Sequence, residues 1–130
     1  MSEILIDHVL LDRVTKAAKE SLRLRMNYNF HESLSSPSQR LLNALEPGTV
    51  LPIHRHRHTA ETYVLLRGRM RVLFYDDDKK EINRYELDPA EGTYGVNIPR
   101  GQWHTIEVLC AGTVIFEVKD GPYIPIAPND

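Results

Sequence analysis

The sequence has a single cysteine, Cys110, so no disulfide bond can form within the chain. The residues around it, VLCAGT, supply neither a flanking cation nor a helix start that would activate a thiol. We therefore interpret Cys110 as a small buried hydrophobe near a turn, and thiol chemistry is not indicated.

Long apolar runs are also missing. No stretch reaches the roughly 18 apolar residues that a membrane-spanning helix needs. The N-terminal segment, MSEILIDHVLLDRVTK, carries acidic residues early and has no small-residue cleavage site after an apolar run, so it does not resemble a signal peptide. We expect a protein that does not contact a membrane and is located in the cytoplasm.

Neither sign of charge dominates the chain. It contains 16 Lys and Arg against 18 Asp and Glu, a formal net charge of -2. A nucleic acid is held by a concentrated positive field, which this composition does not provide, so nucleic acid is not an expected partner. The length of 130 residues predicts one domain.

The hydrophobic pattern predicts one helix followed by many short strands. Helical spacing from about Asp7 to Met26 predicts an amphipathic helix with a core stripe of Leu10, Val14, Ala17 and Leu22. From Arg40 on, turn signals separate short runs: RLLNAL, IHRH, ETYVLL, RMRVLFY, INRYEL, TYGVNI, WHTIEVL and VIFEV. Such spacing is typical of an all-β sandwich or small barrel. We expect residues 1–39 to form a helix and connecting segment packed on a barrel of residues 40–120, and residues 121–130, rich in proline, to form an extended arm.

The stretch HRHRHTAETYVLLRG, residues 54–68, places three histidines at alternate positions. On a strand, His54, His56 and His58 would face one side and the arginines between them the other. Neutral imidazole is the commonest protein metal ligand, and a carboxylate on the next strand can complete such a set. Glu61 fits that part. A further ligand should come from a strand distant in sequence, where His104 follows the turn at Pro99 and Gly101.

These residues closely resemble the two motifs of the cupin family. The first motif is matched in full by Gly48, TVLPI, His54, Arg55, His56, RHTA, Glu61, TYVLLR and Gly68. The second is matched by Pro99, Gly101 and His104, but its leading glycine, Gly92, is one place early and Val108 stands where an asparagine belongs. The helix, the NYNFH segment and IPRGQWHT together also resemble the WbuC family of small bacterial cupins from surface-polysaccharide gene clusters.

The resemblance implies a cupin, that is, a jelly-roll-like β-barrel, here with an N-terminal α-helix. It implies that His54, His56, Glu61 and His104 bind a divalent metal ion, which could be Fe, Mn, Zn, Ni or Co. It also makes a homodimer plausible, and suggests a context of sugar and surface-polysaccharide metabolism. It does not imply an organic cofactor or name a reaction.

Two further residues near the motif are candidates for catalysis. Tyr63 shares the strand face of Glu61, where its phenol could transfer a proton or only fill the core. His58 could bind the metal, contact a substrate at the entrance, hydrogen-bond a ligand residue or lie in solvent. Trp103, on the opposite face from His104, is interpreted as a packing residue.

The ligand set leads to two hypotheses of different class. In the first, the protein is a metal-dependent enzyme acting on a small oxygenated molecule, a sugar or a hydroxy or keto acid, as an isomerase, epimerase or dioxygenase. In the second, it is a binding or sensing module whose metal anchors a carbohydrate or another small ligand without turnover.

Overall fold

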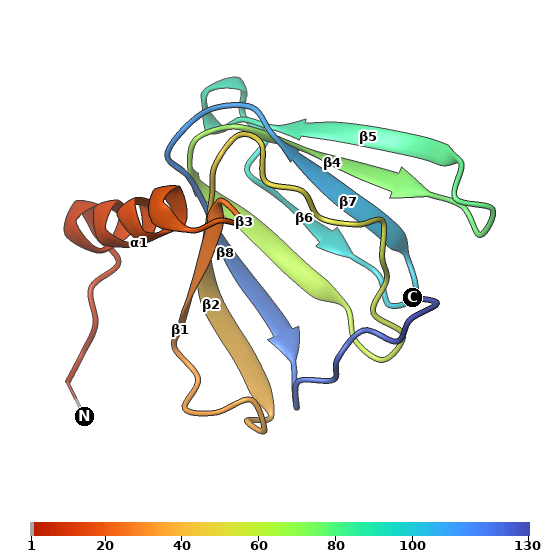
Figure 1. Cartoon of the computed structure of the whole chain (residues 1–130), viewed down its shortest axis with the longest axis horizontal. Coiled ribbons are helices and arrows are strands. Elements are labelled where there is room, and N and C mark those ends of the chain that lie inside the picture. Colours follow the sequence, from red (N-terminus) through yellow and green to blue (C-terminus); the bar gives the residue numbers. More distant parts are fainter. Residues whose placement is uncertain (1) are drawn as a thin grey trace.

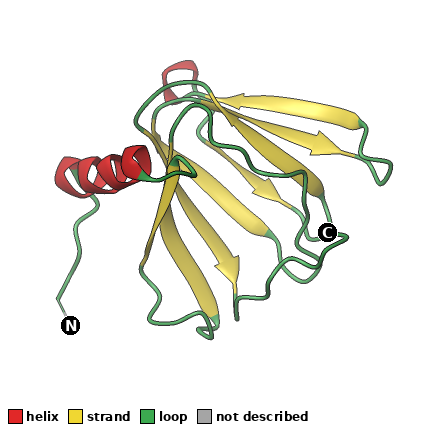
Figure 2. Ribbon diagram, in the orientation of Figure 1, coloured by secondary structure: helices red, strands yellow, loops and turns green. Residues whose placement is uncertain are grey.

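Two antiparallel sheets and one N-terminal helix make up the computed structural model, which describes residues 2–130 (Figure 1, Figure 2). The helix α1 spans His8–Glu20, and a short 3-10 helix, η1, spans Pro89–Glu91. The strands are β1 Arg25–Asn29, β2 Ser38–Leu45, β3 Glu61–Arg67, β4 Met70–Tyr75, β5 Glu81–Leu87, β6 Gly95–Ile98, β7 Trp103–Val108 and β8 Thr113–Asp120. The fold is therefore mostly β with one N-terminal helix, as the sequence predicts.

The strands form a five-stranded sheet of order β1-β2-β8-β3-β6 and a three-stranded sheet of order β5-β4-β7. Every predicted run after Arg40 forms a strand except IHRH, which lies in the connection between β2 and β3. The alternating NYNFH segment contributes to β1, which pairs with β2. Among residues 2–130 the strand ladders stay within each sheet. The two sheets are not closed on each other, and the predicted barrel is not confirmed.

The helix α1 is shorter than the predicted range Asp7–Met26. The carboxylate of Asp7 caps its start by accepting a hydrogen bond from the backbone N–H of Leu10 at 3.0 Å. The helix ends at Ser21, whose backbone is extended, and Leu24 adopts a left-handed conformation with φ of 57°. The chain thereby reverses into β1, and Leu22, predicted to be a core residue, is instead fully exposed on this turn.

The structure has a hydrophobic core on each face of the five-stranded sheet. The inner core lies between the two sheets and is formed by residues such as Leu65, Met70, Val72, Leu87 and Ile115. The outer core lies under α1, whose buried Leu10, Leu11, Val14 and Ala18 pack against Leu42, Ala44 and Val114 of the sheet. The helix thus covers one face of the five-stranded sheet, and the other face, towards the three-stranded sheet, carries the inner core and the candidate metal centre described below.

In the part of the chain that the structure describes, residues 2–130, no helix is long and apolar enough to cross a membrane.

The variant Leu42→Ala tests whether the outer core under α1 stabilises the fold, and Leu22→Ala, at an exposed leucine, is its control. Leu42 is completely buried under α1, so its truncation should lower the free energy of unfolding by about 2–5 kcal/mol. The matched control, Leu22→Ala, should change it by no more than about 0.5 kcal/mol, because Leu22 is exposed. Urea denaturation measures both. Equal losses in the two variants would show that α1 does not pack on the sheet as described.

Candidate metal centre

The connection between β2 and β3 places two histidines beside β7. His54 forms an isolated antiparallel bridge with His104, in which each backbone N–H donates to the other residue's carbonyl, at 3.0 and 2.8 Å. The carbonyl of His56 accepts a hydrogen bond of 2.8 Å from the N–H of Gly101. Gly101 has a φ of 81°, which favours glycine, so the PRG turn before β7 helps to fix the position of His56.

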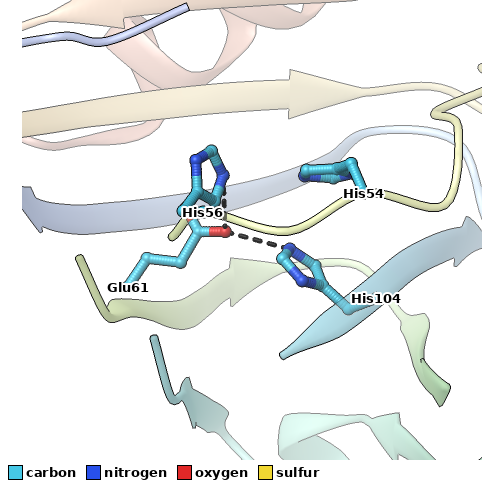
Figure 3. A group of neighbouring side chains, drawn as sticks. All are labelled: His54, His56, Glu61 and His104. Atoms are coloured by element: carbon cyan, nitrogen blue, oxygen red, sulfur yellow. Dashed lines mark hydrogen bonds and ion pairs between the residues drawn. The ribbon is translucent and has the colours of Figure 1, made fainter. Parts of the chain in front are cut away.

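Four side chains converge where this connection meets β3 and β7 (Figure 3). His54 and His56 come from the connection, Glu61 from the first position of β3, and His104 from β7. One potential ligand atom from each residue lies within 4.8 Å of those of the other three. His54, Glu61 and His104 are buried, and the side chain of His56 is 16% exposed. The group is therefore enclosed and has its most open side at His56.

Backbone carbonyls fix the orientation of two of the imidazoles. Nδ1 of His54 lies 2.8 Å from the carbonyl oxygen of Pro52, and Nδ1 of His104 lies 2.9 Å from that of Gln102. A carbonyl oxygen can only accept a hydrogen bond, so Nδ1 carries the proton in both rings. Nε2 of each ring is then left for the centre of the group. Such outer partners commonly orient metal-binding histidines.

A single carboxylate oxygen, Oε1 of Glu61, is shared by three neighbours. Nε2 of His104 lies at 3.0 Å, the hydroxyl of Tyr63 at 2.9 Å and Nε2 of His56 at 3.4 Å. Burial acts to raise the pKa of Glu61, but the interactions with His104 and His56 outweigh it and hold the pKa well below its usual range. Glu61 is therefore a buried carboxylate that stays ionised.

The donor set fits a divalent metal ion. Nδ1 of His104 is bonded to a carbonyl, so only a proton or a cation on Nε2 makes its 3.0 Å approach to the ionised oxygen of Glu61 favourable. Burial, followed by the nearby His104, lowers the pKa of His54 to about 4, so this ring is neutral at pH 7. Three imidazole nitrogens and one carboxylate oxygen suit Mn, Fe, Co, Ni or Zn.

His58 does not join this group. The sequence predicts His54, His56 and His58 on one face of a strand, but residues 55–60 form no strand, and a bend at residues 57–58 ends the alternation before His58. His54 and His56 still converge, because separate backbone contacts with β7 hold each of them. His58 is exposed and, together with His56, lines a pocket beside the group.

Tyr63 faces the site, as its alternation with Glu61 predicts. It is buried, and its hydroxyl donates to Glu61. Burial, and then the negative charges of Glu61 and Glu117, raise the pKa of Tyr63 well above its ordinary value. The phenol therefore keeps its proton at neutral pH and supports the position of the Glu61 carboxylate.

Glu117 is a site residue that the sequence reasoning missed. It lies on β8 directly opposite Tyr63 of β3 and is only 8% exposed. Its Oε1 accepts a hydrogen bond of 3.0 Å from Nδ2 of Asn43, whose own Oδ1 is buried without a partner. Burial, followed by the charge of Glu61, raises the pKa of Glu117 to about 7. The sequence contains a signal for this residue, because Glu117 lies two positions after Ile115 and therefore on the same buried strand face.

Trp103 is buried at the start of β7, which agrees with its interpretation as a packing residue. The guanidinium carbon of Arg55 lies 4.4 Å from the centroid of its ring, and Nζ of Lys79 lies 4.7 Å from it. Arg55, between the two candidate ligands His54 and His56, thus contacts the same strand from which His104 comes.

Comparisons with known proteins identify the fold. A family model described as "Domain of unknown function (DUF6016)" matches residues 6–87. No curated protein sequence matches the chain. Among solved structures, the capsular polysaccharide assembling protein CapF from Staphylococcus aureus is 23% identical, with a TM-score of 0.63, over 76% of this chain and 27% of that one. This chain therefore spans about a quarter of CapF.

Two further solved structures agree on the cupin fold. The cupin domain of Cnp3 from Schizosaccharomyces pombe is 10% identical, with a TM-score of 0.59, over 74% of this chain and 64% of that one. Oxalate decarboxylase from Bacillus subtilis, studied for its Mn(II) centres, is 20% identical, with a TM-score of 0.58, over 78% of this chain and 26% of that one. The chain thus has the cupin fold that its motifs predict.

Glu117→Gln tests the buried carboxyl through the pH dependence of stability. Between the ordinary pKa of 4.5 and about 7, the folded chain holds a proton on Glu117 that the unfolded chain has released. The wild-type protein therefore loses this stabilisation as pH rises through that window, and the variant does not. At about 1.36 kcal/mol per pKa unit, Glu117→Gln should gain on the order of 3 kcal/mol relative to wild type from pH 4.5 to 8.

Urea denaturation of both metal-free proteins in chelator measures this difference at each pH. The low pKa of His54 gives an opposite slope between its ordinary value and about 4, but it is common to both proteins and cancels in the comparison. A stability difference that is independent of pH would contradict the assignment of a raised pKa to Glu117.

Proposed function

We propose that this chain, which belongs to the family described as Domain of unknown function (DUF6016), holds a divalent metal ion with its buried histidine and glutamate group and uses it to bind a small oxygenated molecule. The observation that carries the proposal is the convergence of four potential ligand atoms within 4.8 Å, with Nδ1 of His54 and of His104 already bonded to backbone carbonyls.

The charge of the group favours a ligand with an anionic or chelating oxygen. Three neutral imidazoles and one carboxylate around a divalent cation leave a net charge of about +1. When bound, such a cation supplies Lewis-acid polarisation of a hydroxyl or carbonyl oxygen. Nitrogen and oxygen donors accommodate Mn, Fe, Co, Ni and Zn, and the Mn(II) centres of oxalate decarboxylase, which shares the fold, support manganese as the first ion to test.

We further propose an enzyme of the isomerase or epimerase type, in which side chains of the inner face move a proton at a carbon beside a polarised oxygen. Glu117 supports this proposal, because it places a second buried carboxyl, with a raised pKa, opposite Tyr63 and beside the metal group. Tyr63, with its raised pKa, serves as a hydrogen-bond donor, and His58, which lines the pocket, is the second candidate catalytic residue. The alternative enzyme type within this proposal is a dioxygenase that uses the same four metal-binding residues.

The substrate that we propose is sugar-derived and belongs to surface-polysaccharide metabolism. The resemblance of the sequence to the WbuC family supports this context, and so does the description of CapF as a capsular polysaccharide assembling protein. Elemental analysis of protein purified without an affinity resin should come first. Assays of sugar-nucleotide turnover and of dioxygen uptake then separate the enzyme from its alternative.

A metal-anchored binding or sensing module is the second candidate. The hydrogen bond from Tyr63 to Glu61 favours it, because this phenol is engaged in supporting the carboxylate rather than free to act on a ligand. Tight binding of a sugar or acid without product in either assay would select the module. The predicted homodimer and cytoplasmic location remain predictions, for which analytical ultracentrifugation and cell fractionation are the direct tests.

A matched pair of histidine variants tests the metal group. His56→Ala should weaken Mn²⁺ binding at least tenfold, about 1.4 kcal/mol, because it removes one of the four ligand atoms. His58→Ala, two positions along the same connection but outside the group, should bind Mn²⁺ as wild type does. Equilibrium dialysis with elemental analysis gives the affinities, and circular dichroism checks the fold. Equal affinities in the two variants would falsify the assignment of His56 as a ligand.

A further inference from the structure

A pocket of about 310 Å³ lies beside the candidate metal group, between residues 55–59 and residues 119–130. In Figure 1 the dark blue segment after β8 runs next to the yellow-green connection that precedes β3. His56 belongs both to the pocket lining and to the metal group. Because His56 is also the most exposed of the four group residues, the pocket adjoins the open side of the group.

Asp130 holds the wall formed by residues 121–130 against the connection before β3. Its backbone carbonyl accepts a hydrogen bond of 2.8 Å from the N–H of Arg55, and its carboxylate pairs with Nε of Arg55 at 2.9 Å and with Nε of Arg57. Arg55 is also held against the ring of Trp103. Arg57 keeps 47% of its side chain exposed and lines the pocket.

Lys119 lines the pocket from the end of β8. It lies on β8 opposite Glu61 of β3, so both residues are on the same face of the sheet. Its Nζ is 5.7 Å from the centroid of the Tyr123 ring. The ammonium group is therefore near the wall formed by residues 121–130, and its charge also lowers the pKa of Glu117 on the same strand.

The two walls of the pocket differ in character. Residues 121–130 supply apolar side chains that remain 43–53% exposed, namely Tyr123, Ile124 and Ile126. On the charged side, Arg55 and Arg57 are both paired with Asp130, and Lys119 and Asp120 complete the charged lining. A molecule that fills the pocket thus meets an apolar surface on one side and the cationic groups of Lys119 and Arg57 on the other.

We propose that this pocket binds an organic anion, whose carboxylate or phosphate group contacts Lys119 and Arg57 while its carbon skeleton lies on Tyr123, Ile124 and Ile126. An oxygen elsewhere on the same molecule reaches the metal group past His56. This inference rests on the proposed function and deepens it, since it restricts the small oxygenated ligand to one that also carries an acidic group. Lys119 and Arg57 then determine specificity between acidic and neutral sugars.

Isothermal titration calorimetry of the Mn²⁺-loaded protein tests the proposal with three probes. Glucuronate carries a carboxylate, glucose 6-phosphate carries a phosphate, and glucose is the neutral counterpart. We expect wild-type protein to bind at least one acidic probe at least tenfold more tightly than glucose, and the preference between the two identifies the acidic group. Lys119→Gln should reduce that affinity at least tenfold.

Lys16→Gln is the matched control, because Lys16 is an exposed lysine of α1, outside the pocket lining. Lys119 is a better target than Arg57, whose pairing with Asp130 would be lost together with its charge. Mn²⁺ content is measured in every sample. If wild-type protein binds Mn²⁺ but binds no acidic probe better than glucose, or if the two lysine variants behave alike, the pocket proposal is wrong and the metal proposal stands. A wild-type protein that binds no Mn²⁺ overturns both.

Discussion

The buried carboxylate of Glu61 is the constraint on which the arrangement of the site depends. An ionised carboxylate away from water is costly unless it is paired and hydrogen-bonded. Its partners come from three places: His104 on β7, His56 in the connection before β3, and Tyr63 two residues along its own strand. Glu61 lies in the five-stranded sheet and His104 in the three-stranded sheet. Their contact therefore joins two sheets that strand ladders do not close, and the site is also a structural tie.

In the connection between β2 and β3, the histidines and arginines of residues 54–57 point to opposite sides. His54 and His56 turn towards Glu61, whereas Arg55 and Arg57 turn towards Asp130, and Arg55 also covers Trp103. The irregular backbone lacks the ladder hydrogen bonds of a strand, so these side-chain contacts and the bridge to His104 position the histidines. The arginines are therefore part of what preorganises the group.

The convergence of His54, His56, Glu61 and His104 was predictable from the match to the two cupin motifs, because strand alternation alone does not bring the distant His104 to the other three. Strand alternation placed Tyr63 inside, and the same alternation places Glu117 on the buried face of β8 with Ile115. The exclusion of His58 was not predictable, since it depends on backbone bonds to residues 101 and 104 that are far away in sequence. The prediction that Leu22 is a core residue was wrong for a similar reason. The turn into β1 is held by a hydrogen bond from the backbone N–H of Glu46 to the carbonyl of Leu24, a contact between residues far apart in sequence.

Charge balance connects the metal group, Glu117 and the pocket. Along the inner face of β8, Glu117 is followed two positions later by Lys119, and both strand neighbours of this pair on β3, Tyr63 and Glu61, belong to the site. Two adjacent carboxylates, Glu61 and Glu117, repel each other, so one is ionised while the other tends to keep its proton. The ammonium group of Lys119 acts in the opposite direction and lowers the pKa of Glu117. A divalent cation beside Glu61 would also weaken the repulsion between the two carboxylates. The protonation of Glu117 thus depends on the charges of its neighbours on β3 and β8.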